Sequence, residues 1–296
     1  MTPEAHFLHE KSGLEAVLSP PLERPRAMDW VGTSTRLIVA TAEGELIEVD
    51  PIFGTRTFGD RVDDPALLVV APHGKRMAIV ERCGRVALHA VGNGKRIAEV
   101  PFGLVGDMSM AWFRTKGALA LVVCGDTLKG RQALIVDEEF ERTRRARLPS
   151  GAVLGPGREG RLLIARCSTT GLEVMPFGKA LEPAEPTSHR LRFGPQGQII
   201  GVTNSGVTCW RGRRDSPHTV AMLDVTAAAV SPDGRQVAIG GRGGEVALAQ
   251  IDGDQVERGR PGKVGGHTSA VRRIVFSSGR DNWLATSGER LRIWKY

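Results

Sequence analysis

The sequence predicts an all-β protein, a single seven-bladed β-propeller whose ring is closed by an N-terminal strand that completes the last blade. Three observations predict this fold. Short apolar runs recur about every 40 residues, turns rich in Gly and Pro bound these runs, and no long segment has the apolar period of a helix. A repeat of this length with about four strands per unit is typical of propeller blades.

The second strand of each unit carries the repeat most clearly. Seven apolar runs follow one another at nearly even spacing: Arg36–Val39, Arg76–Ile79, Ala118–Leu121, Arg161–Ile164, Gln198–Gly201, Gln236–Ile239 and Asn282–Ala285. These runs are apolar almost throughout, whereas a strand with one wet face would alternate. Continuous apolarity indicates strands that are covered on both faces, as the inner strands of stacked blades are.

Turns separate the strands at regular places. Ala71–Gly74, Gly194–Gly197 and Ser231–Gly234 each contain Pro followed by Gly, which favours a hairpin between first and second strands. Short Gly turns then lead into third strands. The fourth strands are weakly marked, as is typical of exposed sheet edges. We expect them at Thr55–Phe58, Lys95–Val100, Arg144–Leu148, Thr219–Met222 and Gln255–Arg258.

The repeat also predicts how the chain is divided. A closure segment covers 1–23 and the propeller covers 24–296, with blades at about 24–60, 64–100, 107–148, 151–187, 188–222, 224–263 and 266–296. The last unit, Gly266–Tyr296, supplies three strands of its own. We therefore expect the spare run Leu14–Leu18 to pair with Leu291–Trp294 and close the ring. No appended domain remains outside the blades.

Composition places the chain among ordinary globular proteins. Hydrophobic residues make up 41% and charged residues 25%, and the net charge of +7 permits an acidic partner. No run is long enough for a membrane span, and the N-terminus has no signal-peptide pattern. The four cysteines form no CxxC pair, and Cys83, Cys124 and Cys167 read as small apolar residues at equivalent strand ends. We expect a reduced, cytoplasmic protein without metal or cofactor.

The last two units resemble repeats of the WD-repeat propeller family. The resemblance is carried by Gly266–His267, Leu284–Thr286 and Leu291–Trp294, and in the preceding unit by Val230–Gly234 with Val237–Gly240. By its period it extends over 24–296. The Ala-, Gly-, Arg- and Pro-rich composition favours a bacterial member.

The resemblance implies one structural network and one kind of role. His267, Thr286 and Trp294 match the residues that hydrogen-bond within a blade of this family. Glu289 stands in the turn where the family has Asp, and Lys295 follows Trp294 in place of a second Asp. The family further implies a scaffold with partner-binding surfaces and no catalysis of its own.

Motifs of catalysis are missing from the sequence. It contains no GxSxG nucleophile elbow, no GxxxxGK[ST] phosphate loop, and no HxH or HExxH spacing of histidines. An enzymatic site assembled at the channel mouth from several blades stays open as an alternative. We predict no catalytic residue and no metal ligand.

Arginine runs are the most visible polar feature. We predict that they lie on the rim and bind a partner, and the candidates are Arg142, Arg144, Arg145, Arg147, Arg211, Arg213 and Arg214. Such runs also serve as solvated edges that prevent strand pairing, or contact phosphates of nucleic acid or lipid. Aromatic residues are only 5% and do not interleave with the arginines, which argues against base-stacking platforms.

These observations together predict a non-catalytic scaffold subunit of a cytosolic multiprotein complex, because repeat folds offer broad rigid binding surfaces. The expected partner is a protein with an acidic surface. A nucleic-acid-associated subunit is the first alternative and a propeller enzyme the second. The loops expected to face the partner are 60–65, 125–131, 179–190 and 259–266, and the expected apolar anchors are Phe102, Trp112 and Phe177.

Overall fold

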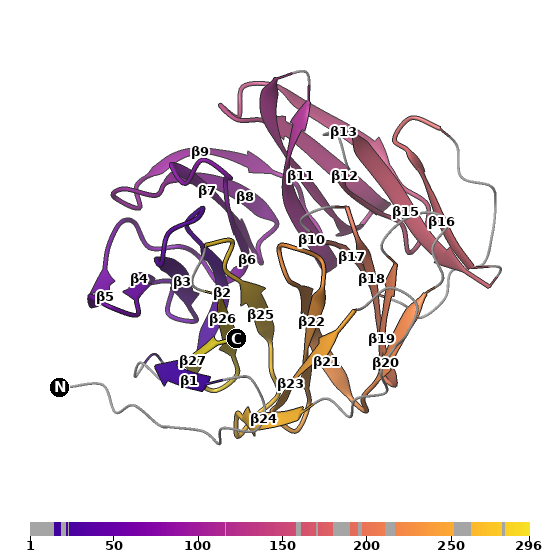
Figure 1. Cartoon of the computed structure of the whole chain (residues 1–296). Helices are drawn as coiled ribbons and strands as arrows, with labels where there is room; N and C mark the ends of the chain where they lie inside the picture. Colours follow the sequence, from indigo (N-terminus) through magenta and orange to yellow (C-terminus); the bar gives the residue numbers. More distant parts are fainter. Residues whose placement is uncertain are drawn as a thin grey trace.

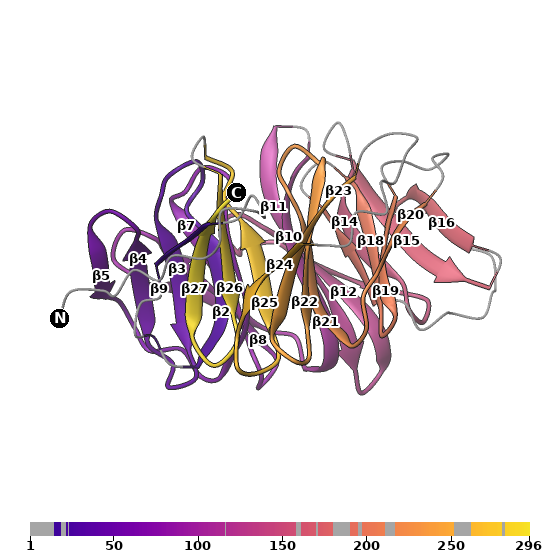
Figure 2. The same cartoon turned by 60° about the horizontal axis from the view of Figure 1, so that its bottom comes forward.

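The chain folds into a ring of seven antiparallel sheets, a seven-bladed β-propeller (Figures 1 and 2). The computed structural model describes residues 15–18, 22, 24–115, 117–157, 161–169, 171–179, 190–194, 197–210, 217–251, 262–279 and 282–296. Within these residues no helix is long and apolar enough to cross a membrane.

Consecutive strands build each of the first four blades. The first three blades are β2 (Pro25–Trp30), β3 (Leu37–Thr41), β4 (Leu46–Asp50) and β5 (Gly54–Thr57); β6 (Pro65–Val70), β7 (Arg76–Glu81), β8 (Arg85–Ala90) and β9 (Arg96–Pro101); and β10 (Leu104–Thr115), β11 (Ala118–Thr127), β12 (Gly130–Asp137) and β13 (Thr143–Arg147). In the described residues the fourth blade has β14 (Val153–Pro156), β15 (Leu162–Ser168) and β16 (Gly171–Pro176).

The last three blades follow the same order, except that the seventh contains strands from both ends of the chain. They are β17 (Arg190–Phe193), β18 (Ile199–Thr203), β19 (Gly206–Trp210) and β20 (His218–Ala221); β21 (Val225–Val230), β22 (Gln236–Gly241), β23 (Glu245–Gln250) and β24 (Gly262–Gly266); and β25 (Arg273–Phe276), β26 (Trp283–Ser287) and β27 (Leu291–Lys295) with β1 (Glu15–Leu18). β1 pairs antiparallel with β27, with Glu15 opposite Lys295 and Ala16 opposite Trp294.

The second strands lie where the repeat predicts them. β3, β7, β11, β15, β18, β22 and β26 begin at residues 37, 76, 118, 162, 199, 236 and 283. Their centres are buried, because a neighbouring blade covers each face. The turn glycines Gly74, Gly197 and Gly234 have φ of 71°, 80° and 73°, the left-handed conformation that these hairpins require.

The fourth strands fit less well. β5, β9, β13 and β20 overlap the expected segments, but the fourth strand of blade six is Gly262–Gly266. The segment expected there, Gln255–Arg258, lies outside the described residues. The position of β24 is set by the pairing of Gly266 with Glu245. Neither residue is apolar, so the sequence does not reveal this pairing.

Apolar contacts between blades stabilise the ring. Among the described residues there are seven hydrophobic clusters, and each one joins two neighbouring blades. The cluster between blades seven and one contains Met28, Trp30 and Val39 from one side and Trp283 and Ile293 from the other. The burial of these apolar side chains stabilises the stacking of neighbouring blades.

Hydrogen bonds between innermost strands add direction to this packing. The indole N–H of Trp30 donates to the carbonyl of Val275 at 3.1 Å, which ties blade one to blade seven. The N–H of Val70 donates to the carboxylate of Asp29 at 2.8 Å, which ties blade two to blade one. Each satisfies a polar group in the inner wall of the ring.

One contact recurs between blades. The turn glycines Gly44, Gly84 and Gly244, between second and third strands, have φ of 82°, 84° and 92°. Their carbonyls each accept an N–H at 2.8 Å from the loop that leads to the next blade, and the donors are Val62, Phe102 and His267. These three residues are therefore equivalent, and all three are buried. His267 is the polar version of a position that is elsewhere apolar.

Candidate functional site: the upper face

The alternating strand directions give the ring two faces. We call upper the face that carries the turns between second and third strands and the loops joining blades. We call lower the face that carries the remaining turns. The innermost strands start at the upper face, so residues at their beginnings surround the upper end of the ring's centre.

The structure brings His267, Thr286 and Trp294 together inside blade seven. Nε2 of His267 lies 2.8 Å from Oγ1 of Thr286, and the indole N–H of Trp294 donates to the same oxygen at 2.9 Å. All three residues are buried. Nδ1 of His267 faces the Glu289 carboxylate at 3.6 Å. With the proton on Nδ1, the hydroxyl of Thr286 donates to Nε2 and accepts from Trp294.

Burial lowers the pKa of His267 to about 4, against the opposing charge of Glu289. His267 is therefore neutral at pH 7. The carboxylate of Glu289 in turn accepts the N–H groups of Thr268 and Ser269 at 3.0 and 3.2 Å. This network fixes the loop that enters blade seven, and it is a structural network.

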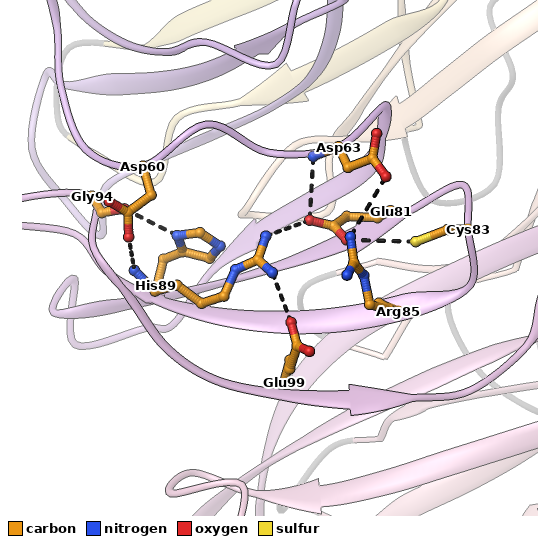
Figure 3. A network of polar contacts seen from close by, with 9 residues as sticks. Asp60, Asp63, Glu81, Cys83, Arg85, His89, Gly94 and Glu99 are labelled. Carbon is orange, nitrogen blue, oxygen red and sulfur yellow. Dashed lines mark hydrogen bonds and ion pairs between the residues drawn. The ribbon is translucent and has the colours of Figure 1, made fainter.

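Blade two contains a charged network that the sequence analysis missed (Figure 3). The Glu81 carboxylate is fully buried between two guanidinium groups, Arg85 at 2.7 Å and Arg96 at 2.6 Å. Burial works to raise the pKa of Glu81, but the N–H of Asp63 and the two arginines outweigh it, so the pKa is below its usual value. The N–H of Arg96 also donates to Asp60 at 2.8 Å.

The loop 60–65, expected to face a partner, is held by this network. Asp60 and Asp63 take part in it, and Val62 is buried beneath them. The segment is therefore held in place by hydrogen bonds, and its contact with a partner stays a prediction. Its acidic residues bind the outer strands of blade two to the end of blade one.

The predicted rim arginines of blade three are on β13, but two of them lie against aromatic rings. The guanidinium of Arg144 lies 5.6 Å from the ring centroid of Phe177, and that of Arg145 lies 5.8 Å from that of Phe102. Arg145 also donates to the carbonyl of Pro101. Because side chains alternate along a strand, one arginine reaches blade four and the other blade two.

Arg142 and Arg147 are exposed, and their guanidinium groups have no hydrogen bond or ion pair with a described residue. The backbone N–H of Arg142 donates to the Asp137 carboxylate at 3.1 Å. Arg211, Arg213 and Arg214 lie outside the described residues, as does most of the expected loop 179–190. Of the expected loop 259–266, residues 262–266 form β24 instead of a loop, and 259–261 lie outside the described residues.

The expected apolar anchors Phe102 and Trp112 were wrong. They are only 4% and 8% exposed, and both belong to the cluster between blades two and three. Phe177 packs against the cluster between blades three and four and lies under Arg144. Among the described residues, the most exposed large apolar side chains on the upper face are those of Leu128, which is 94% exposed, and Leu223, which is 81% exposed.

Arginines gather at the upper end of the ring's centre. Arg192 of β17 forms a two-armed ion pair with Asp107 of β10, at 2.9 and 3.4 Å, and so reaches past blade four. Arg131 donates to the carbonyl of Ala152 and pairs with Asp126 at 3.0 Å. Arg273 of β25 donates to a backbone carbonyl of β6.

The pKa shifts in this group report its positive field. Burial works to raise the pKa of Asp107, but the charges of Arg192, Arg131 and Arg190 outweigh it, so the carboxyl stays ionised. Burial and the charge of Arg192 lower the pKa of Arg273 to about 10, so its guanidinium is still protonated at neutral pH. The centre of the upper face is thus a cationic surface.

An open pocket of about 560 Å³ lies beside this group, where blade seven meets blade one. We call it the seam pocket. The described residues that line it are Arg24, Arg26, Ser269, Arg272, Gly288, Glu289 and Arg290. None of the four arginine side chains has a hydrogen bond or ion pair with a described residue, and Nε of Arg26 is buried without a partner.

No group of three or more His, Cys, Asp or Glu side chains that could hold a metal ion occurs in the part of the chain that the structure describes. The four cysteines are free thiols, and Cys124, Cys167 and Cys209 are buried while Cys83 is exposed. The strand-end positions of the first three differ in burial, because Cys83 falls in the turn after β7.

The fold and this surface define the class of the protein as a β-propeller with a cationic upper face. No protein-family model matches the sequence, and no curated protein matches it. Solved structures match the fold. Raptor from Chaetomium thermophilum aligns with a TM-score of 0.72 at 13% identity, over 98% of this chain and 29% of Raptor.

The β-propeller domain of Cps50 (Swd1) from Myceliophteria thermophila aligns with a TM-score of 0.69 at 15% identity, over 96% of this chain and 99% of that domain. The architecture therefore matches propellers of the WD40 type. This chain spans less than a third of the Raptor chain, and at these identities the likeness concerns the fold alone.

Proposed function

We propose that this protein is a non-catalytic interaction subunit of a cytosolic multiprotein complex, and that its partner docks on the upper face through an acidic surface. The observation that carries the proposal is the surplus of arginines on the upper face. Four of them, Arg24, Arg26, Arg272 and Arg290, have side chains that pair with no acid among the described residues. A rigid ring with unpaired charge on one face favours an oppositely charged partner.

Apolar contacts supply affinity where charges supply orientation and rate. Leu128, at the tip of the β11–β12 hairpin, and Leu223, in the loop before β21, are the exposed leucines of this face. They take the place of the buried Phe102 and Trp112 as apolar anchors.

Two features support the other parts of the proposal. The four free cysteines suit a reducing compartment. The pairing of β1 with β27 supports a closing role for the N-terminal strand, which would keep blade seven against blade one under the load of a bound partner.

Purification of the tagged protein from its own cells tests the proposal. We expect a protein to co-purify in fixed stoichiometry after nuclease treatment. The variant Leu128→Asp/Leu223→Asp should lose it, because charge at both anchors removes the apolar contact. The matched control is Phe53→Asp on the lower face, where Phe53 is 86% exposed.

Two results would contradict the proposal. Retention of the partner by the upper-face variant and its loss from the Phe53 variant would place the interface on the lower face. Nucleic acid as the main bound component, with affinity falling steeply as salt rises, would favour the nucleic-acid alternative.

A further inference from the structure

The seam pocket has the composition of an anion site. Four guanidinium groups, from Arg24, Arg26, Arg272 and Arg290, line it together with one carboxylate, Glu289. That carboxylate is already engaged by the N–H groups of Thr268 and Ser269, by His267 and by Arg292 at 3.7 Å. The pocket therefore carries a surplus of positive charge that no described residue neutralises.

Backbone hydrogen bonds hold the arginines close to one another. The N–H of Arg24 donates to the carbonyl of Glu289 at 3.1 Å, and the N–H of Arg272 donates to that of Ser287 at 2.6 Å. The N–H of Gly288 donates to the carbonyl of Arg290 at 3.1 Å. The three segments that carry the arginines are thus tied into one scaffold, so like charges cannot simply move apart.

Two local features have a cost that a ligand would offset. Arg24 has a φ of 51°, a left-handed conformation that residues other than Gly, Asn and Asp seldom adopt. Nε of Arg26 is buried without a hydrogen-bond acceptor, although buried donors are nearly always satisfied. An oxyanion in the pocket would neutralise the surplus charge around these residues.

The residues also select the kind of anion. Guanidinium groups bind the oxygens of phosphate in pairs, and several of them around one point favour a dianion over a single carboxylate. No aromatic residue is among the described residues that line the pocket, so a nucleobase has nothing to stack on there. Ser269 adds a hydroxyl donor at the wall.

We propose that the seam pocket binds a phosphate monoester dianion, with Arg26 and Arg272 as its main ligands. The proposal deepens the proposed function and rests on it only for the source of the phosphate, which is a phosphorylated side chain of the docked partner or a small phosphate ester. Binding itself is a property of the isolated protein.

Calorimetric titration of the isolated full-length protein tests the site, with inorganic phosphate, glycerol phosphate and a phosphoserine peptide as probes at constant ionic strength. We expect saturable binding that weakens at least about tenfold in Arg26→Ala/Arg272→Ala. The matched control is Arg142→Ala/Arg147→Ala, which removes the same charge from two exposed positions, one just before β13 and one at its end, and should bind as the native chain does. Unfolding curves verify that both variants fold.

The probes separate the sources. Tighter binding of the phosphoserine peptide than of glycerol phosphate places the phosphate on a protein partner, and the reverse order places it on a small molecule. Absence of phosphate binding, or equal binding in both double variants, would overturn the site while leaving the co-purification test of the complex unaffected. Stronger binding of an oligonucleotide than of any monoester, lost in the seam variant, would overturn the assigned ligand.

Discussion

Two groups of arginines in this propeller, those of β13 and those of the seam pocket, differ in how their side chains are paired. Those of β13 are neighbours in sequence, yet Arg144 and Arg145 point to different blades and lie over Phe177 and Phe102. The four arginines of the seam pocket come from three segments, yet they line one pocket, where their side chains pair with no described residue. The arginines that are consecutive in the sequence thus lie along the exposed edge strand β13. The arginines that are concentrated in space, those of the seam pocket, come together because the last blade lies beside the first.

The comparison predicts that the seam, and not the rim, depends on β1. Deletion of residues 1–18 removes the strand that pairs with β27. We expect the free energy of unfolding to fall by about 3 kcal/mol or more, since β27 loses the hydrogen-bonded neighbour on its outer side. Phosphate binding in the seam pocket should be lost with it.

Thermal and denaturant unfolding measure this effect, and deletion of residues 1–14 is the control that keeps β1 intact. An unchanged melting temperature after deletion of 1–18 would show that the ring closes without this strand.

The next largest effect is expected at Thr286. Thr286→Val removes the hydroxyl that serves both His267 and Trp294, and leaves two buried nitrogens without partners. We expect a loss of roughly 2–3 kcal/mol in the free energy of unfolding. Because His267 positions Glu289 at the pocket wall, phosphate affinity should fall as well.

Urea unfolding checks the size of the loss, with Thr208→Val as the control, since the Thr208–Thr219 pair is at the surface. If Thr286→Val and Thr208→Val lost the same free energy of unfolding, the buried network of His267, Thr286 and Trp294 would not stabilise the fold as we expect.

A pH dependence follows from the same residue. The pKa of His267 is about 4 in the folded protein, below the usual value of 6.5. The unfolded chain therefore binds the proton more readily, so the contribution to stability is present above pH 6.5 and is lost as the pH falls toward 4. Between pH 7 and pH 5 we expect a loss of about 2 kcal/mol from this group.

His267→Gln serves as the reference, because it cannot take up the proton. If the pH profile of stability of the native chain matches that of His267→Gln between pH 7 and pH 5, the buried neutral histidine is not the cause.

The smallest effect is expected on the rim. Arg144→Ala and Arg145→Ala should each cost about 0.5–1 kcal/mol through the lost contact with an aromatic ring. Phosphate affinity and partner binding should stay unchanged. Arg142→Ala, which removes an exposed arginine without a ring, should stay within about 0.5 kcal/mol of the native chain. Loss of the partner in Arg144→Ala/Arg145→Ala would return the rim to the binding surface.

The seven second strands could be predicted because a strand that is buried on both faces has apolar side chains on both, and so forms an unbroken apolar run in the sequence. The fourth strands could not be placed as well, since an exposed edge selects few residue types, and β24 has hardly an apolar side chain. The buried Phe102 was misjudged for a different reason. Its equivalence to Val62 and His267 appears only when the chain is aligned on Gly44, Gly84 and Gly244, a signal that the sequence does contain.

The seam pocket had no such signal. Arg24 and Arg26 lie near one end of the chain and Arg272 and Arg290 near the other, and short arginine pairs like theirs are common in this Gly- and Arg-rich sequence. Only the return of the chain to its starting blade brings them together. The predicted network of His267, Thr286 and Trp294 was accessible because its residues share one blade and one family pattern.

The place where phosphate binds can be seen directly in a crystal structure of the protein grown without sulfate and soaked in phosphate. We expect a phosphate in the seam pocket, within hydrogen-bond distance of the guanidinium groups of Arg26 and Arg272. Phosphate found only along β13, or at neither place, would contradict it.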